Sequence, residues 1–218
     1  MPSTVVHVAL AGLIVAALLP ERYFDRRAVA VALAMAVVPD LDVFLTPVIV
    51  GAHRSVGHTL LFPASLAVAA WLDRRRERPL VGRLLGPGGG AVVGAGLVGM
   101  TLAAIGLDYA ANGVNLLWPV HDQFYAANGK LVVSNRRGLV QTFVDLSPEP
   151  PGDGGGGGGG QKRTTQNTHY STGVDPSRGD EPENVERLFP VVRSGWQLLV
   201  VATGTLVVGA RLRLSRSV

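Results

Sequence analysis

The sequence has no cysteine, few charged residues and few aromatic residues. Without cysteine, its 218 residues cannot form a disulfide framework or a cysteine-ligated metal site. Charged residues make up 17% of the chain and hydrophobic residues 47%, and the mean hydropathy is +0.29. This composition indicates a membrane protein.

The sequence also lacks an apolar run as long as the roughly 20 residues that cross a bilayer straight. Shorter apolar stretches cover residues 5–19, 28–38 with a continuation from residue 43, 59–72, 91–107 and 195–210. Flanking residues can extend such helices into the interface, and a broken segment is tolerated where it lines a cavity. We therefore predict an all-α integral membrane protein with about five transmembrane helices. The PDLD motif at residues 39–42 would border a pocket, either within one broken helix or between two half-helices.

The arginines predict the orientation of these helices. Three arginines follow the first stretch, five follow the third and three follow the fifth, whereas the loop between the second and third stretches has Arg54 alone. Short loops rich in arginine and lysine stay in the cytoplasm, and long loops cross largely regardless of charge. We expect a multi-pass protein of the inner (cytoplasmic) membrane, with its N-terminus outside and its C-terminus in the cytoplasm.

The region between the fourth and fifth stretches divides into two parts. Residues 116–146 contain alternating apolar runs that predict a small β-hairpin, with Asn128 and Gly129 as its turn. Residues 147–187 include seven consecutive glycines and predict a flexible, disordered linker. The expected organisation is a membrane core at 1–120, an external elaboration at 121–146, this linker, and a C-terminal helix with a basic tail at 188–218.

Several histidines and aspartates converge on one face of the membrane in this topology. Ionisable groups at membrane depth are costly and usually functional. Each residue taken alone also has a structural interpretation, as an interfacial histidine, a helix cap or an interfacial aspartate. Four separate segments carry the converging residues to the outer face: His7, Asp40, Asp42, His53, His58 and Asp108.

The motif HRSVGHTLLF, residues 53–62, contains two of these histidines. His53 and His58 are five residues apart, which is about 140° around an α-helix, so one helix would not aim both at the same ion. A loop that carries His53 and a helix N-terminus that carries His58 would bring them together. The spacing leaves a shared metal site and two structural histidines as open alternatives.

Imidazole and carboxylate together are ligands for divalent metal ions. Zinc is the first expectation, with iron, manganese or nickel as alternatives. A divalent ion lowers the pKa of a bound water and so supplies a nucleophile for ester, phosphoester or amide hydrolysis. Asp42 would be a spare carboxylate acting as general base, and Arg54 would bind an anionic substrate group or a lipid headgroup.

Four motifs resemble those of the YdjM-like family of inner-membrane proteins, described as LexA-binding, membrane-bound metal-dependent hydrolases. They are STVVHVALAGLIVA at residues 3–16, AVVPDLDVF at 36–44, HRSVGHTLLF at 53–62 and GLDYAANGVNLLWPV at 106–120. The resemblance implies a membrane-bound metal-dependent hydrolase. It also implies that the metal-site residues are His7, Asp40, His53, His58 and Asp108, with Asp42 beside them.

Two departures from the family pattern lie at the fourth motif: Ala104, just before it, and Ala111, within it, replace a common histidine and a common threonine. They favour a second hypothesis, a non-enzymatic membrane scaffold or stress protein, or a small transporter that relays protons through the same groups. The arginines form clusters beside the membrane, so we expect contact with membrane lipid and not with nucleic acid. The sequence does not indicate an oligomeric state.

Overall fold

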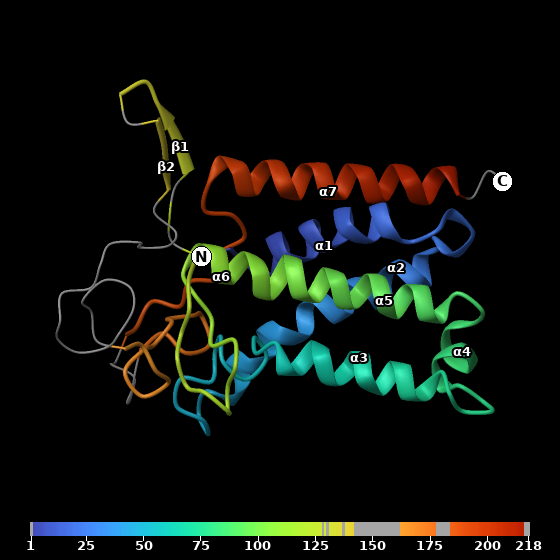
Figure 1. Cartoon of the computed structure of the whole chain (residues 1–218), viewed down its shortest axis with the longest axis horizontal. Helices are drawn as coiled ribbons and strands as arrows, with labels where there is room; N and C mark the ends of the chain where they lie inside the picture. Colours follow the sequence, from blue (N-terminus) through green and yellow to red (C-terminus); the bar gives the residue numbers. More distant parts are fainter. Residues whose placement is uncertain are drawn as a thin grey trace.

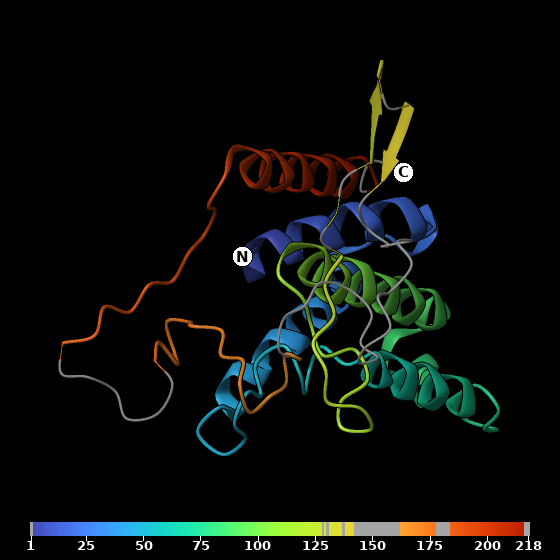
Figure 2. The same ribbon diagram turned by 60° about the vertical axis from the view of Figure 1, so that its left-hand side comes forward.

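A computed structural model describes residues 2–127, 129, 131–136, 138–141, 162–177 and 184–215. It is mostly helical, and the longer helices lie side by side with most of the connecting loops gathered at one end (Figure 1). Helices α1 (Thr4–Leu18), α2 (Arg26–Val37) and α5 (Gly89–Gly99) pack against one another, and α7 (Gly195–Leu214) lies along α1 (Figure 2). The sequence prediction of a predominantly helical membrane protein agrees with this arrangement.

Local sequence signals explain where the first two helices begin. Ser3 precedes α1, and its side chain accepts a hydrogen bond from the backbone N–H of Val6. Asp25 precedes α2 and accepts from the N–H of Ala28 at 2.9 Å, which satisfies one of the free donors of the first turn. A short 3₁₀ turn, η1 (Glu21–Tyr23), connects the two helices.

The PDLD motif does not interrupt the second helix. The 3₁₀ helix η2 (Val38–Leu45) follows α2 directly and includes the whole motif, with Pro39 in its first turn, where a missing N–H costs little. The chain then turns from Thr46 to Leu60. One continuous candidate span is therefore present, not two half-helices, and it changes from α-helical to 3₁₀ winding just before the motif.

Small residues form the contacts between the helices. The main core cluster joins α1, α2 and α5 and contains Val15, Ala16, Leu19, Phe24, Ala28, Val29, Ala32, Val92 and Ala95. Gly204 of α7 approaches α1 so closely that a Cβ there would lie 2.5 Å from the carbonyl oxygen of Ala9. Close backbone approach through small residues is how helices associate in lipid, where the hydrophobic effect contributes little.

Three helical segments of the described chain are long and apolar enough to cross a membrane. They are Arg26–Leu45, which joins α2 and η2, Gly89–Ala111, and α7. Helix α1 and helix α3 (Leu61–Asp73) are apolar but have only 15 and 13 residues. The predicted count of five spans is therefore not confirmed.

The span Gly89–Ala111 contains three consecutive helical segments of two kinds. Helix α5 continues into a π-helical segment, η3 (Met100–Gly106), and then into α6 (Leu107–Ala111), which carries Asp108. The short helix α4 (Leu80–Leu85) connects α3 to α5 at the opposite end of the bundle (Figure 1). Wider π-helical turns inside α-helices often occur at functional sites.

The predicted hairpin is present, but its turn is elsewhere. Strands β1 (Leu131–Ser134) and β2 (Gly138–Gln141) pair antiparallel with Ser134 opposite Gly138. The turn therefore follows Ser134, and the prediction of a turn at Asn128 and Gly129 was wrong. Gly138 has a φ of 66°, a conformation that glycine adopts without strain, so this second glycine supplies the turn.

Candidate metal centre

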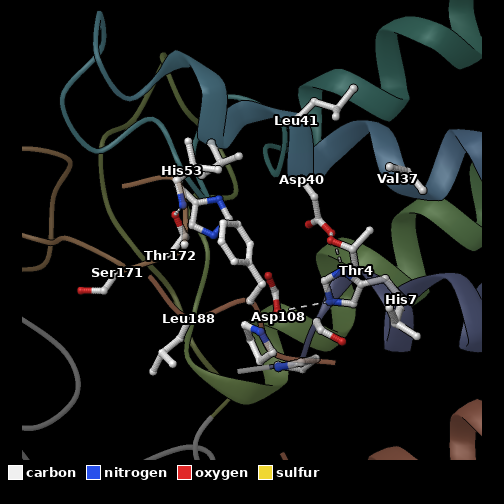
Figure 3. A pocket seen from close by; sticks show the side chains of 18 of the residues that line it. Thr4, His7, Val37, Asp40, Leu41, His53, Asp108, Ser171, Thr172 and Leu188 are labelled. Carbon is white, nitrogen blue, oxygen red and sulfur yellow. Dashed lines mark hydrogen bonds and ion pairs between the residues drawn. The ribbon is translucent and has the colours of Figure 1, made fainter. Parts of the chain in front are cut away.

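The predicted site residues come from four parts of the chain and meet at the loop end of the bundle. Helix α1 supplies His7, η2 supplies Asp40 and Asp42, and α6 supplies Asp108. The turns between η2 and α3 supply His53, Arg54 and His58. Figure 3 shows His7, Asp40, His53 and Asp108 around one cavity.

Asp40 joins η2 to the first turn of α1. His7 donates from Nδ1 to Asp40 Oδ2 at 3.1 Å, and the hydroxyl of Thr4 donates to the same oxygen. Thr4 and His7 are three residues apart and so share one face of α1. The other imidazole nitrogen, His7 Nε2, lies 3.4 Å from Asp108 Oδ1. Asp40 thus fixes the ring of His7 so that Nε2 faces the centre of the cluster.

His58 is fully buried and is held in the same way. Its Nδ1 lies 3.0 Å from Asp42 Oδ2, while Nε2 lies 3.4 Å from both Asp40 Oδ1 and Asp108 Oδ2. A histidine that binds a metal usually donates its other ring N–H to a carboxylate, which fixes its orientation and makes the ligating nitrogen more basic. The contacts of His58 match that arrangement.

Asp42 accepts hydrogen bonds from four donors. Besides His58, its oxygens accept from His53 Nδ1 at 2.8 Å, from the backbone N–H of Arg54 at 3.0 Å and from that of Gly57 at 3.2 Å. Gly57 allows this turn to approach η2, because a Cβ there would overlap the carbonyl oxygen of Pro39. In a 3₁₀ helix, residues two apart differ by about 240°, which explains why Asp42 faces the turns while Asp40 faces α1.

Arg54 is completely buried and forms an ion pair with Asp108. Its Nη2 donates to Asp108 Oδ1 at 2.7 Å, and its guanidinium carbon lies 4.6 Å from the ring centre of Tyr170. The backbone carbonyl of Arg54 also accepts from the N–H of Asn115. With its side chain enclosed in this way, Arg54 has no exposed surface that could contact a lipid headgroup.

The cluster offers a set of ligand atoms for one ion. Asp40, His58 and Asp108 each present an atom within 4.8 Å of the others. His7 Nε2 and His58 Nε2 are buried and have no hydrogen-bond partner within the described chain, although both face carboxylate oxygens. Buried polar atoms are normally paired, and an ion is one explanation for those that are not. Imidazole nitrogen and carboxylate oxygen are also the donors that zinc accepts, so the residues present fit a divalent ion.

The electrostatics of His58 favour positive charge at this position. Burial alone would lower the pKa of His58, because desolvation disfavours the imidazolium ion. The carboxylates of Asp42, Asp108 and Asp40 outweigh burial and raise the pKa of His58 well above its usual value. The three carboxylates therefore attract a cation to the position that His58 Nε2 faces.

His53 occupies the edge of the cluster. Its Nδ1 is held by Asp42, its side chain is 11% exposed, and it lines the cavity together with His7, Asp40 and Asp108. It does not belong to the group of three mutually close ligands found in the described chain. The structure thus brings His53 next to the ligand group, at the wall of the cavity.

The cavity has a volume of about 340 Å³ and opens beside the ligand cluster. Residues 171–174 and 188–190, which the sequence places in or next to the expected linker, form part of its wall. Of the linker prediction at 147–187, residues 147–161 and 178–183 lie outside the described residues. Tyr170 contacts the carbonyl oxygen of Gly113 through its hydroxyl, which anchors this part of the wall over Arg54.

Sequence reasoning did not identify Thr4, Tyr170 or the wall residues. The spacing of Thr4 and His7 on one helix face would have pointed to Thr4. The positions of Tyr170 and of residues 171–174 had no such signal. Tyr170 contacts Gly113, 57 residues away in the chain, and residues 171–174 line a cavity with residues of α1 and η2.

Comparison with known proteins identifies a family. No curated protein and no solved structure matches the chain significantly. The sequence model of the YdjM inner membrane protein family matches residues 1–167, which include every residue of the cluster. This match covers more of the chain than the four motifs do, and it confirms the resemblance drawn from them. The three apolar spans agree with the membrane location that the family implies. The chain therefore belongs to the YdjM inner membrane protein family.

Proposed function

We propose that this protein is a membrane-bound metal-dependent hydrolase that acts on an ester or phosphoester at the extracytoplasmic membrane interface. His7, Asp40, His58 and Asp108 would hold one divalent ion, with zinc as the first candidate. The observation that carries the proposal is that His7 Nε2 and His58 Nε2 face carboxylate oxygens in a buried cluster and have no hydrogen-bond partner among the described residues. When bound, such an ion polarises an ester or phosphoryl oxygen and acidifies water.

The surrounding residues take different roles in this proposal. Asp42 already accepts four hydrogen bonds, so we assign it the positioning of His53 and His58 in place of general-base catalysis. His53 lines the cavity and is oriented through Nδ1, which leaves Nε2 to exchange a proton with water or substrate. Arg54 is enclosed against Asp108 and Tyr170, so it neutralises a carboxylate and does not bind substrate.

The proposed location at the outer face rests on the arginines. The arginine-rich segments lie between α1 and α2, between α3 and α4, and at the end of α7, at the other end of the bundle from the site. Arginine-rich short loops stay in the cytoplasm. The site would then open on the extracytoplasmic side, with the N-terminus outside and the C-terminus inside.

A second candidate function is proton-coupled transport. The ionisable groups form a continuous and largely buried chain, from His53 through Asp42 and His58 to Asp40 and His7. Chains of aspartate and histidine within a membrane protein can relay protons. Ala104 is fully buried at the position where the family resemblance implies a histidine, which also favours a function without catalysis. Metal retention distinguishes the two candidates.

The experiment is metal analysis by mass spectrometry on tag-free protein purified in mild detergent. We expect near-stoichiometric zinc, iron, manganese or nickel in the wild type and loss of that metal in the His58→Ala and Asp40→Ala variants. His121→Ala and Asp73→Ala serve as matched controls, because His121 pairs with Gln123 in a loop and Asp73 caps α4. Metal absent from the wild type, or kept by both site variants, would refute the metal centre and favour the proton relay.

A further inference from the structure

The cavity beside the ligand cluster has one polar end and extended apolar walls. His7, Asp40 and Asp108 form the polar end. The walls include Val37, Leu41, Phe44, Leu188 and Phe189. In Figure 3, Leu41 and Val37 lie on one side of Asp40 and His7, and Leu188 lies across the cavity on the other side. A site for a small polar substrate would not need such walls, so the shape favours a molecule with a polar group and an apolar part.

The apolar walls continue onto the surface of the protein. Leu41 and Phe44 are 49% and 62% exposed, and Phe189 is 69% exposed. Leu41 and Phe44 belong to η2, which ends the candidate span Arg26–Leu45. An apolar chain lying on these residues could therefore extend from the cavity into the surrounding bilayer without crossing water.

A divalent ion would make the charge of the site suitable for an anionic group. Asp40, Asp42 and Asp108 carry three negative charges when ionised, and Arg54 together with a divalent ion balances them. Arg193 also lines the cavity, is exposed, and has no hydrogen bond or ion pair from its guanidinium within the described chain. Arg193 leaves the metal-loaded site with one positive charge, which matches the single negative charge of a phosphodiester.

We infer that the cavity binds an anionic phosphodiester lipid, with its phosphate between the metal site and Arg193 and one chain along Leu41, Phe44 and Phe189. This inference rests on the proposed metal centre and names the substrate class of that site. A volume of about 340 Å³ is near the lower end of the roughly 300–1,000 Å³ typical of ligand pockets. The cavity therefore takes the headgroup and the first part of a chain, while the rest of the lipid stays in the bilayer.

The test compares three soluble probes by calorimetric titration of zinc-loaded protein in amphipol. Dihexanoylphosphatidylglycerol has both the phosphodiester and the chains, dihexanoylglycerol has the chains alone, and glycerophosphoglycerol has the phosphodiester alone. We expect the first probe to bind at least about tenfold more tightly than either of the others, because both charge and apolar contact contribute. Mass spectrometry of the probe after each titration separates binding from turnover.

Two variants locate the contacts. Phe44→Ser is expected to weaken binding of the two chain-bearing probes while zinc content stays unchanged, and the adjacent Leu45→Ser, outside the cavity wall, is its control. Arg193→Gln is expected to remove most of the preference for dihexanoylphosphatidylglycerol over dihexanoylglycerol. Arg78→Gln, which replaces an exposed arginine between α3 and α4, is the matched control. Chelation of zinc should weaken the binding of the two probes that contain phosphate and leave the binding of dihexanoylglycerol unchanged.

The outcomes separate this inference from the proposed function. If the protein retains zinc but binds all three probes with equal affinity, the lipid inference is overturned and the metal centre stays intact. The same holds if Phe44→Ser and Arg193→Gln behave like their controls. A preference for the phosphodiester lipid that persists in protein that holds no metal overturns the metal centre and retains the lipid site. Loss of both the metal and the preference overturns both.

Discussion

The two ends of the helix bundle both contain many charged residues but use them in opposite ways. At the site end, Arg54, Asp42 and Asp108 are at most 3% exposed. Arg54 forms an ion pair with Asp108, and Asp42 contacts His58. At the other end, Arg74, Arg75, Arg76 and Arg78 follow α3 and are exposed. Charges at one end are fixed in a specific geometry, and those at the other end are solvated.

This difference shows how burial changes what a charge contributes. An exposed ion pair stabilises a protein by about 0–1 kcal/mol, because water competes with it and the side chains lose freedom. Removing one member of a buried pair costs about 3–5 kcal/mol, because the other member is left without compensation. The site end therefore depends on each residue individually, whereas the basic end depends mainly on its total charge and its place relative to the membrane.

The largest expected effect concerns which end faces outward. The chain has no native cysteine, so single cysteines report accessibility directly. In spheroplasts, an impermeant maleimide should label Val133→Cys, in β1 at the site end, and should label Arg78→Cys only after the membrane is opened. Val133 is 81% exposed. Labelling of Arg78→Cys in sealed spheroplasts would reverse the proposed orientation.

The next effect is the loss of a buried charge partner. Arg54→Met should lower the free energy of unfolding by about 3–5 kcal/mol, because Asp108 would be left buried without its guanidinium. Arg27→Met, at the basic end, removes an exposed hydrogen bond to the carbonyl of Leu84 and should change stability by about 0.5 kcal/mol or less. Thermal unfolding in detergent with a chelator present measures both. Equal losses would show that burial does not distinguish the two ends.

The smallest effect tests positioning within the cluster. Asp42→Asn removes the charge that orients His58, and it should weaken zinc binding by about 10–100-fold while helical content is kept. His53→Gln loses the other histidine held by Asp42 but keeps the three mutually close ligands, so its zinc affinity should stay near the wild-type value. Competition with a chromogenic chelator gives the affinities. An unchanged affinity for Asp42→Asn would refute its positioning role.

Much of the site could be predicted because its residues lie in short motifs at the ends of apolar stretches. Hydropathy and arginine distribution placed His7, Asp40 and Asp108 at one face, and the structure brings them within contact distance. The roles of Asp42 and Arg54 could not be predicted in the same way. Whether the Asp42 carboxylate is free or already accepts four hydrogen bonds depends on the path of the turns between Thr46 and Leu60. No periodic pattern in the sequence specifies that path.

The fold shows the same limit. The sequence left PDLD as a break within one helix or between two half-helices, because proline and aspartate also favour turns. Only the contacts of η2 with α1 and η3 show that it continues the helix. The hairpin turn was misplaced because Asn128–Gly129 and the later Gly138 are both plausible turn positions. Pairing of Ser134 with Gly138 decides between them.

By itself, the sequence determined that this chain is a helical membrane protein without cysteine chemistry, with histidines and aspartates gathered at one end of its helices. These properties follow from composition and from local periodicity, which each segment carries without its neighbours. Tertiary structure alone decided which nitrogens and oxygens face one another, which charges are enclosed, and that residues 171–174 and 188–190 wall the cavity. Those properties depend on distances between segments far apart in the chain, and only the packing of the whole bundle fixes such distances.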